Sequence, residues 1–313
     1  MKVRWGVLGV AGIATRKVIP AMQLGEHSEI VAIASRDLSR AEAAARDLGI
    51  PKAYGSYETL LADPEIEAVY NPLPNHLHVP WSIRAAEAGK HVLCEKPIAM
   101  SVAEALELVR ARDRTGVKIG EAFMVRTHPQ WLRARELVVS GRIGQLRAIS
   151  GFFSYYNDDP ANIRNKVELG GGALMDVGCY PIFCSRFLFC EEPARAFGVI
   201  DRDPAFGTDR LTSAVLEFPS GHAIFTSSTQ IAKYQRMLLV GTQGRIEIEI
   251  PFNAPNDRPT RILIDDTYEE FPICDQYTIQ GDLFSQAIRE GGDVAVPLEE
   301  SVRNMTVIEA IRR

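Results

Sequence analysis

The sequence predicts an α/β protein, in which an N-terminal Rossmann domain precedes a C-terminal α+β domain with an open, mostly antiparallel sheet. Over residues 1–121, short apolar runs alternate with helix-like runs, as in a parallel sheet with crossover helices. A glycine-containing turn follows the first apolar run directly. From residue 122 onward, long strand-like stretches joined by turns replace this alternation, which indicates an antiparallel sheet.

The elements of the first domain follow from apolar runs and from capping residues. Helix ends are predicted at Gly49, after "RAEAAARDL", and at Gly89, after "VPWSIRAAEA". Ser101, with Glu104 three residues later, predicts the start of a third helix. The predicted strands are Arg4 to Leu8, Ile30 to Ala34, Ala68 to Asn71, His91 to Cys94 and Lys118 to Glu121.

The second domain begins with a linking helix in "HPQWLRARELVVSGRIG". Strands are then expected in "LRAISGFFSYYN", "RLTSAVLEF", "HAIFTSSTQI", "RMLLVGTQGRIEIEI" and "RILIDD". We therefore predict a nucleotide-binding domain at residues 1–121 and a substrate-binding and oligomerisation domain at residues 122–313. The 313 residues, 46% of them hydrophobic, are enough for two packed cores.

Charge and hydropathy exclude several classes of partner. The net charge is −5, and no run of Lys and Arg is long enough to follow a nucleic-acid backbone. Apolar runs are far shorter than the roughly 20 residues of a membrane helix, and "MKVRWGVLGV" does not resemble a secretory signal. We expect a cytoplasmic protein whose partner is a small molecule.

No metal site or disulfide framework is expected. The five cysteines, an odd number, are spread over a long chain, which is typical of reduced thiols. Cys179, Cys184 and Cys190 do not have the spacing of zinc ligands, and His76 and His78 lack acidic or cysteine neighbours at ligand spacing.

The segment "GVLGVAGIATRKVIPAM" is a variant of the dinucleotide-binding fingerprint. Gly9 would make the tight turn, and Ala14 stands where the helix packs on the strand. Ala11 replaces the second glycine, so one methyl group has to be accommodated next to the pyrophosphate. Gly9, Ala11, Gly12 and Ile13 are the predicted pyrophosphate-binding residues, because N–H groups at a helix N-terminus favour an anion.

The end of the second strand, "AIASRDLSR", bears on the choice of cofactor. Ser35 can donate to a 2′-phosphate, and Arg36 can pair with it or lie on the adenine. Asp37 could cap the next helix or reach the ribose hydroxyls and admit the unphosphorylated cofactor. On this chemistry NADP is favoured over NAD.

Two further segments lie where strands of a parallel sheet end, the edge that binds ligands. In "NPLPNHLH", prolines interrupt regular structure, and Asn75 or His78 could cap the following helix or contact the cofactor. In "CEKP", Lys96 emerges at the same edge, with Glu95 to orient its ammonium group and Pro97 to direct the chain. Pro72, Asn75, His78, Glu95 and Lys96 complete the predicted cofactor site.

The segments "GVAGIA", "NPLPNHLH", "AAEAGKHVLCEKPIAM" and "GGGALMDVGCY" resemble the glucose-fructose oxidoreductase, inositol dehydrogenase and rhizopine-catabolism protein (Gfo/Idh/MocA) family. The resemblance extends over nearly the whole chain. It is strongest to the branch of dimeric dihydrodiol dehydrogenases, NADP-dependent xylose dehydrogenases and 1,5-anhydrofructose reductases. It implies that Lys96 lies next to the nicotinamide and that Tyr180 takes the place of a histidine found in many relatives.

The chemistry of alcohol oxidation indicates roles for Tyr180 and Lys96. A hydride moves to the nicotinamide while a base takes the hydroxyl proton, and reduction runs backward. Tyr180 is the predicted acid/base, although a free phenol has a pKa near 10. An ammonium group about 4 Å away would favour the phenolate by about 4 kcal/mol at most, or roughly three pKa units. Lys96 is therefore predicted to lower the pKa of Tyr180 and to stabilise charge on the substrate oxygen.

Asp176 is the third predicted catalytic residue, four positions before Tyr180 and on the same face if the segment is helical. It could bind a substrate hydroxyl, pair with Lys96, position the tyrosine or serve only as a cap. Gly178 and Pro181 argue against a regular helix. The glycines at 170–172 allow close backbone approach or make a simple turn. The predicted substrate-binding residues are Lys96, Arg126, Phe153, Arg164, Asp176 and Tyr180, of which Arg126 and Phe153 are implied by the family fold alone.

The predicted function is hydride transfer between NADP, or NAD, and the hydroxyl or carbonyl of a sugar, polyol or dihydrodiol-like substrate. The alternative is a non-catalytic regulator that binds the dinucleotide on the same fold. Retention of both Lys96 and Tyr180 speaks against a regulator, which needs no proton relay. A homo-oligomer, dimer or tetramer, is expected from the family.

Overall fold

The computed structural model describes residues 1–313. Contacts between Cα atoms divide the chain into two compact units. The first unit consists of Met1–Met124 and Asp275–Val302, and the second of Val125–Cys274 and Arg303–Arg313. Helix α8 (Gln276–Glu290), which the sequence analysis assigned to the second domain, thus belongs to the first unit.

The first unit contains a six-stranded sheet in the order β3-β2-β1-β4-β5-β6, with every neighbouring pair parallel. All five predicted strands are present, and β3, only three residues long, is the one that sequence reasoning missed. The order is that of a dinucleotide-binding Rossmann sheet. The strands are β1 (Val3–Leu8), β2 (Ser28–Ala34), β3 (Lys52–Tyr54), β4 (Ala68–Asn71), β5 (His91–Cys94) and β6 (Ile119–Glu121).

The helices of this unit start and stop at residues suited to their caps. Ser101 accepts a hydrogen bond from the Glu104 N–H at 3.2 Å, which opens α5. Gly49 and Gly116, with φ of 66° and 73°, end α2 and α5 in the left-handed conformation that favours glycine. The helices are α1 (Ile19–Gln23), α2 (Leu38–Leu48), α3 (Tyr57–Ala62), α4 (His78–Glu87), α5 (Val102–Thr115) and α8.

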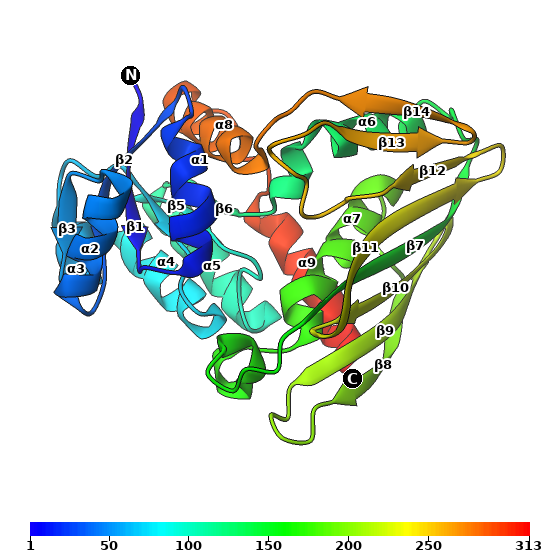
Figure 1. Cartoon of the computed structure of the whole chain (residues 1–313), viewed down its shortest axis with the longest axis horizontal. Helices are drawn as coiled ribbons and strands as arrows, with labels where there is room; N and C mark the ends of the chain where they lie inside the picture. The colour runs from blue at the N-terminus through cyan, green and yellow to red at the C-terminus, as the bar shows by residue number, and fades with distance from the viewer. The chain divides into compact units, whose positions relative to one another are not determined.

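Both faces of the parallel sheet are covered (Figure 1). On one face, the fully buried Trp5 of β1 shares a core with Ile19 of α1 and Phe284 of α8. On the other face, a Cβ on Gly6 would lie 2.7 Å from Leu60 of α3, so glycine allows this helix to pack closely. The interior position of β1 in the sheet places the turn that follows it at the centre of the carboxyl edge.

The second unit contains an eight-stranded sheet in the order β14-β13-β12-β11-β7-β10-β9-β8. All pairs are antiparallel except β7 with β10, in agreement with the prediction of a mostly antiparallel sheet. The strands are β7 (Leu146–Tyr156), β8 (Arg195–Arg202), β9 (Asp209–Phe218), β10 (Gly221–Ser228), β11 (Gln230–Gly241), β12 (Arg245–Ile248), β13 (Thr260–Ile264) and β14 (Thr267–Phe271).

One face of this sheet carries the core of the second unit. Ile149, Phe225 and Leu239 are buried on that face, and α6 (Pro129–Val139) and α7 (Cys179–Phe189) pack there, with α7 in contact with β7 and α6 with β13. The chain ends with α9 (Leu298–Arg312). The opposite face displays apolar side chains, among them Phe197, Ile224 and Tyr234. None of the helices has the length and the apolar character needed to cross a lipid bilayer.

Candidate functional site

Four of the loops that carry predicted cofactor residues leave the same edge of the parallel sheet. They follow the carboxyl ends of β1, β2, β4 and β5, which are neighbours in the order β2-β1-β4-β5. From β1 the chain adds β2 and β3 on one side and then β4, β5 and β6 on the other, so the strand order reverses between β1 and β4. Such sheets bind dinucleotides at this point. The topology therefore brings Gly9, Arg36, Pro72 and Lys96 to one edge from four separate stretches of sequence.

The glycine loop after β1 has the shape of a phosphate cradle. Gly9 has a φ of 93°, and a Cβ at this position would lie 2.9 Å from Leu73 and 3.5 Å from the Tyr57 hydroxyl. Gly12 is exposed, and the chain then enters a π-helical turn at Ala14–Val18. An accessible, side-chain-poor backbone at the start of a helical segment fits the pyrophosphate of a dinucleotide.

The sequence left two roles open for Asp37 in the loop after β2, capping of the next helix or binding of the ribose hydroxyls, and the structure shows a cap. Asp37 is the N-cap of α2 and accepts hydrogen bonds from the Ser39 N–H at 3.0 Å and the Ser39 hydroxyl at 2.7 Å. The hydrogen bond from Ser39 lowers the pKa of Asp37. The buried Ser35 accepts from the Asp37 N–H at 3.2 Å. The carboxylate is therefore engaged as a cap.

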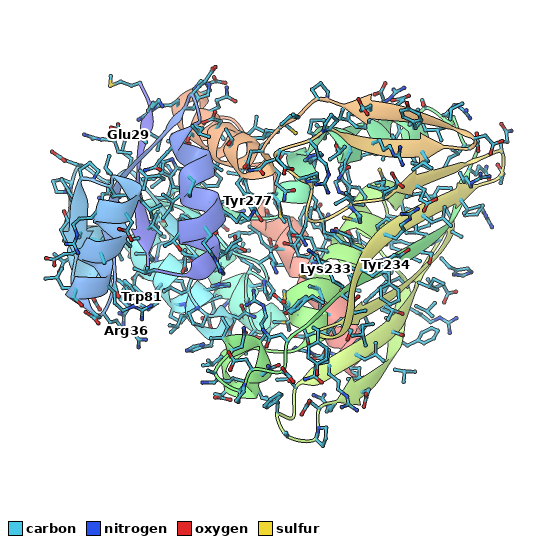
Figure 2. All side chains as sticks on the ribbon, in the orientation of Figure 1. Glu29, Arg36, Trp81, Lys233, Tyr234 and Tyr277 are labelled. Carbon is cyan, nitrogen blue, oxygen red and sulfur yellow. The ribbon has the colours of Figure 1, made fainter.

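Arg36, which precedes Asp37 in the loop after β2, is exposed and lies near Trp81 (Figure 2). It lies close to Tyr57 and forms a hydrogen bond with it. Burial raises the pKa of Tyr57, and the charge and hydrogen bond of Arg36 offset only part of this increase. The Tyr57 ring packs edge-on against Trp81 at 4.7 Å between centroids. Sequence reasoning missed Tyr57, since nothing in the spacing of α3 indicates that its hydroxyl lies between the glycine loop and Arg36.

The loop after β4 is held by His78. The imidazole is 1% exposed, and its Nδ1 and Nε2 atoms each lie 2.7 Å from a main-chain oxygen, of Pro97 and Leu73 respectively. Burial lowers the pKa of His78 to about 4, and the charge of Lys96 contributes to the shift. The ring thus links the β4 loop to the loop that carries Lys96. Asn75 begins a 3₁₀ turn that leads into α4, and Pro72 is buried.

Glu95 and Lys96 follow β5 and are both half-buried. The Tyr70 hydroxyl donates to Glu95 Oε1 at 2.7 Å, and the Lys96 N–H donates to Glu95 Oε2 at 3.3 Å. Burial raises the pKa of Tyr70, and the charge of Glu95 raises it further, so this tyrosine remains a donor. Tyr277 of α8, also shown in Figure 2, has its pKa raised by burial and by Glu95. Sequence reasoning did not find either tyrosine.

In the second unit, Asp176 lies in a π-helical turn, Leu174–Gly178, that continues into α7. Its Oδ2 atom accepts from the Tyr155 hydroxyl at 2.5 Å and from Arg164 Nε at 2.9 Å. Burial raises the pKa of Tyr155, and the carboxylate of Asp176 raises it further. The structure thus brings together two predicted residues, Asp176 and Arg164, and adds Tyr155. Tyr155 stands in β7 without a local signal of its role.

Tyr180, in the first turn of α7, is 5% exposed and packs within an aromatic cluster. Its ring lies 5.6 Å from that of Phe153 and 5.4 Å from that of Phe252. The predicted residues Phe153 and Tyr180 are therefore in contact, while Phe252 is an addition from the structure. The Arg126 guanidinium lies 4.5 Å from the centre of the Phe187 ring.

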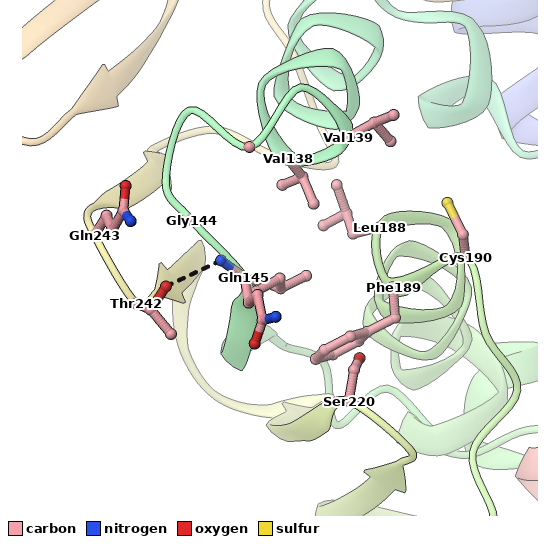
Figure 3. Close-up of a pocket in the computed structure, with 12 residues that line it drawn as sticks. Val138, Val139, Gly144, Gln145, Leu188, Phe189, Cys190, Ser220, Thr242 and Gln243 are labelled. Carbon is pink, nitrogen blue, oxygen red and sulfur yellow. Dashed lines mark hydrogen bonds between the residues drawn. The ribbon is translucent and has the colours of Figure 1, made fainter.

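A cavity of about 730 Å³ in the second unit lies elsewhere, between the ends of α6 and α7 and the turn that joins β11 to β12 (Figure 3). Its lining includes Val138, Leu188 and Gln145, whose N–H donates to Thr242 Oγ1 at 3.1 Å. None of the predicted site residues lines it. No three His, Cys, Asp or Glu side chains in the structure are arranged to hold a metal ion.

Comparisons with known proteins agree with this geometry. Residues 3–123 match the model of the oxidoreductase family with an NAD-binding Rossmann fold, and residues 131–247 match the GFO/IDH/MocA C-terminal domain. The chain is 52% identical to oxidoreductase ORF334 of Rhizobium meliloti, with 99% of this chain and 96% of the relative covered. It is 42% identical to D-xylose 1-dehydrogenase (NADP(+)) 2 of Haloferax volcanii, with coverage of 98% and 95%.

The structure is also similar to a solved one, the 3-ketoreductase KijD10 from Actinomadura kijaniata in complex with NADP and TDP-benzene. The TM-score is 0.92 at 31% identity, and the match covers 100% of this chain and 97% of KijD10. Fold, sequence relatives and family models agree over both units. This chain belongs to the GFO/IDH/MocA family of NAD-binding oxidoreductases.

Proposed function

We propose that this protein transfers a hydride between NADP and the hydroxyl or carbonyl carbon of a sugar, polyol or dihydrodiol-like substrate. The observation that carries the proposal is the convergence of the glycine loop, Arg36 and Lys96 on one edge of the Rossmann sheet. The names of the relatives, a xylose dehydrogenase and a 3-ketoreductase, support a sugar-like substrate.

Residues of the first unit would hold the dinucleotide. The backbone of the loop Gly9–Ile13 would bind the pyrophosphate, while Ser35 and Arg36 would bind a 2′-phosphate on the adenosine ribose. Because Asp37 already caps α2, it is poorly placed to bind the ribose hydroxyls, which favours NADP over NAD. Asn75, His78 and Glu95 would shape the other end of the site, His78 through the main chain of two loops.

Loss of Arg36 should change the selectivity between the two cofactors. A hydrogen bond to a charged group contributes about 1.5–3 kcal/mol, so Arg36→Leu should lower kcat/KM for NADP about 10- to 100-fold and leave that for NAD nearly unchanged. Steady-state kinetics with both cofactors measure this ratio. Arg46→Leu, at an exposed arginine near the other end of α2, is the matched control. An equal loss with NAD and NADP would contradict the assigned role.

The nicotinamide accepts or donates the hydride when the cofactor is bound. Tyr180 would take the hydroxyl proton during oxidation and return it during reduction. The ammonium group of Lys96 would lower the pKa of that phenol and stabilise charge on the substrate oxygen. Asp176, held by Tyr155 and Arg164, would bind substrate hydroxyls or position Tyr180, and Arg126 and Phe153 would line the substrate site.

A panel of aldoses, polyols and diols tested with NADP and NAD would identify the substrate class. Turnover is followed by nicotinamide absorbance, and nucleotide affinity is measured in parallel. We expect turnover with at least one hydroxylated substrate. Tight nucleotide binding without turnover on any member of the panel would instead favour a dinucleotide-binding regulator.

We also propose that the protein forms a homo-oligomer through the exposed face of the eight-stranded sheet. Phe197, Val215 and Ile224 stand opposite one another on three adjacent strands of that face. Phe197 and Ile224 are 55% and 52% exposed, and a contiguous apolar patch of this kind is typical of an interface.

Charges on that face should therefore disrupt assembly. The variant Phe197→Lys/Ile224→Lys should be monomeric by light scattering coupled to gel filtration, where the unmodified protein is a dimer or tetramer. Leu24→Lys, at an exposed leucine of the first unit, should keep the assembly. A monomeric wild-type protein, or an unchanged mass of the double variant, would rule out this interface.

A further inference from the structure

Asp209 is a buried acid whose position has no role in the function proposed above. It opens β9 and is 5% exposed. Its Oδ2 atom accepts from the Leu174 N–H at 2.6 Å and from the Thr212 hydroxyl at 3.0 Å. Leu174 is the first residue of the π-helical turn that contains Asp176. Since the first N–H groups of a helical segment lack partners within it, this carboxylate satisfies one of them from a distant strand.

Gly172 makes this contact sterically possible, and Gly171 allows a second close approach next to it. Gly172 has a φ of +116°, and a Cβ there would lie 1.9 Å from Asp209 Oδ1. A Cβ on Gly171 would lie 2.3 Å from the main-chain oxygen of Arg164, which accepts from the Gly172 N–H at 2.9 Å. Gly172 therefore leaves room for the Asp209 carboxylate, and Gly171 leaves room for the Arg164 main chain.

The pKa of Asp209 is raised overall, and burial is the largest cause. Burial raises the pKa of Asp209, while the hydrogen bonds from Leu174 and Thr212 and the charge of Arg312 lower it. Arg312, in the last turn of α9, is exposed; desolvation by the neighbouring protein lowers its pKa, whereas the charge of Asp209 raises it. Arg202 and Glu309 are the other charged groups that act on Arg312. The acid thus faces a cation from the C-terminal helix.

We propose that Asp209 is a positioning residue for catalysis: by holding Leu174, it fixes the segment 174–180 and with it the side chains of Asp176 and Tyr180. This inference rests on the proposed function, because it assigns to Asp209 an effect that is exerted through Tyr180 and Asp176. It also gives Gly172 a structural purpose beyond a simple turn, namely room for the carboxylate.

The test compares Asp209→Ala with Asp209→Asn. Since a displacement of about 1 Å can cost about 100-fold in rate, Asp209→Ala should lower kcat by roughly that factor. Asp209→Asn keeps an acceptor oxygen of nearly the same shape and should lose only about 10-fold, a partial rescue. Binding of NADPH, measured by fluorescence, should change less than about twofold, because the dinucleotide-binding residues belong to the first unit.

Two further measurements separate positioning from general damage to the fold. Asp203→Asn is the matched control, since Asp203 is also a buried acid that accepts from main-chain N–H groups, of Ala205 at 2.7 Å and Phe206 at 3.0 Å. Its kcat should equal that of the wild type. In a Tyr180→Phe background, Asp209→Ala should cost less than about threefold more, because two residues that act as a unit are not additive.

A kcat of Asp209→Asn within about twofold of the wild type would overturn the inference, even if Asp209→Ala is unfolded by circular dichroism. A full additional loss in the Tyr180→Phe background would also overturn it. Failure of the proposed function looks different: the wild-type protein would then turn over no substrate of the panel, and if only the role of Tyr180 is wrong, Tyr180→Phe alone would keep normal turnover.

Discussion

Replacing Tyr180 by phenylalanine should lower turnover about 10²- to 10⁴-fold, the usual contribution of a positioned acid/base. The change removes only the hydroxyl, because the phenylalanine ring can keep its packing against Phe153 and Phe252. The affinity for NADPH should not change, because the dinucleotide-binding residues belong to the first unit. Initial rates with a substrate found in the panel, together with NADPH titration, measure both quantities.

The matched control for this experiment is Tyr156→Phe. Tyr156 is 64% exposed and donates to Asp158 at 3.2 Å, away from Asp176 and the aromatic cluster. Its loss should leave the rate unchanged. If Tyr180→Phe turns over within about threefold of the wild type, Tyr180 is not the acid/base and the proposed mechanism fails.

Replacing Lys96 by methionine should lower kcat about 10²- to 10³-fold, as expected for the loss of one group that stabilises charge on a reacting oxygen. Methionine keeps the length of the side chain and removes the charge. If Tyr180 is the acid/base that we propose, loss of the ammonium group should let the pKa of its phenol rise toward the free value near 10, so the rate of alcohol oxidation should reach its plateau at higher pH. A pH profile of kcat in the oxidative direction measures this shift.

Lys118→Met is the matched control within the same unit. Lys118 precedes β6 at the amino end of its strand, opposite to the edge that carries Lys96, and its Nζ atom donates to Gly292. We expect its pH profile to be that of the wild type. An unchanged profile in Lys96→Met, with only a lower plateau, would separate stabilisation of the substrate oxygen from any effect on Tyr180.

Much of the fold and of the chemistry could be predicted from the sequence. The family match confirms an NAD(P)-dependent oxidoreductase of the Gfo/Idh/MocA type. The parallel sheet and the mostly antiparallel sheet are both confirmed. These features depend on short-range signals: period-two and helical apolar patterns, capping residues, and glycines at fixed offsets from a strand.

Short elements and partners distant in sequence could not be predicted in the same way. Strand β3 spans three residues, too few to show a period, and the half-polar pattern of β8 gave no signal either. Helix α8 has an apolar face, but an apolar face alone does not indicate which of the two sheets the helix will pack on, and α8 belongs to the first unit. Gly178 and Pro181 suggested a broken helix, whereas the chain continues from a π-helical turn into α7.

The sequence by itself determined the two sheets, the dinucleotide fingerprint and the choice of residues proposed for the site, because each depends on residues close together in the chain. Only the tertiary structure decided which distant groups meet: Tyr70 at Glu95, Tyr155 and Arg164 at Asp176, and Asp209 at Leu174. The physical reason is that a polar side chain can satisfy its hydrogen bonds with many alternative partners, and packing of the cores selects among them.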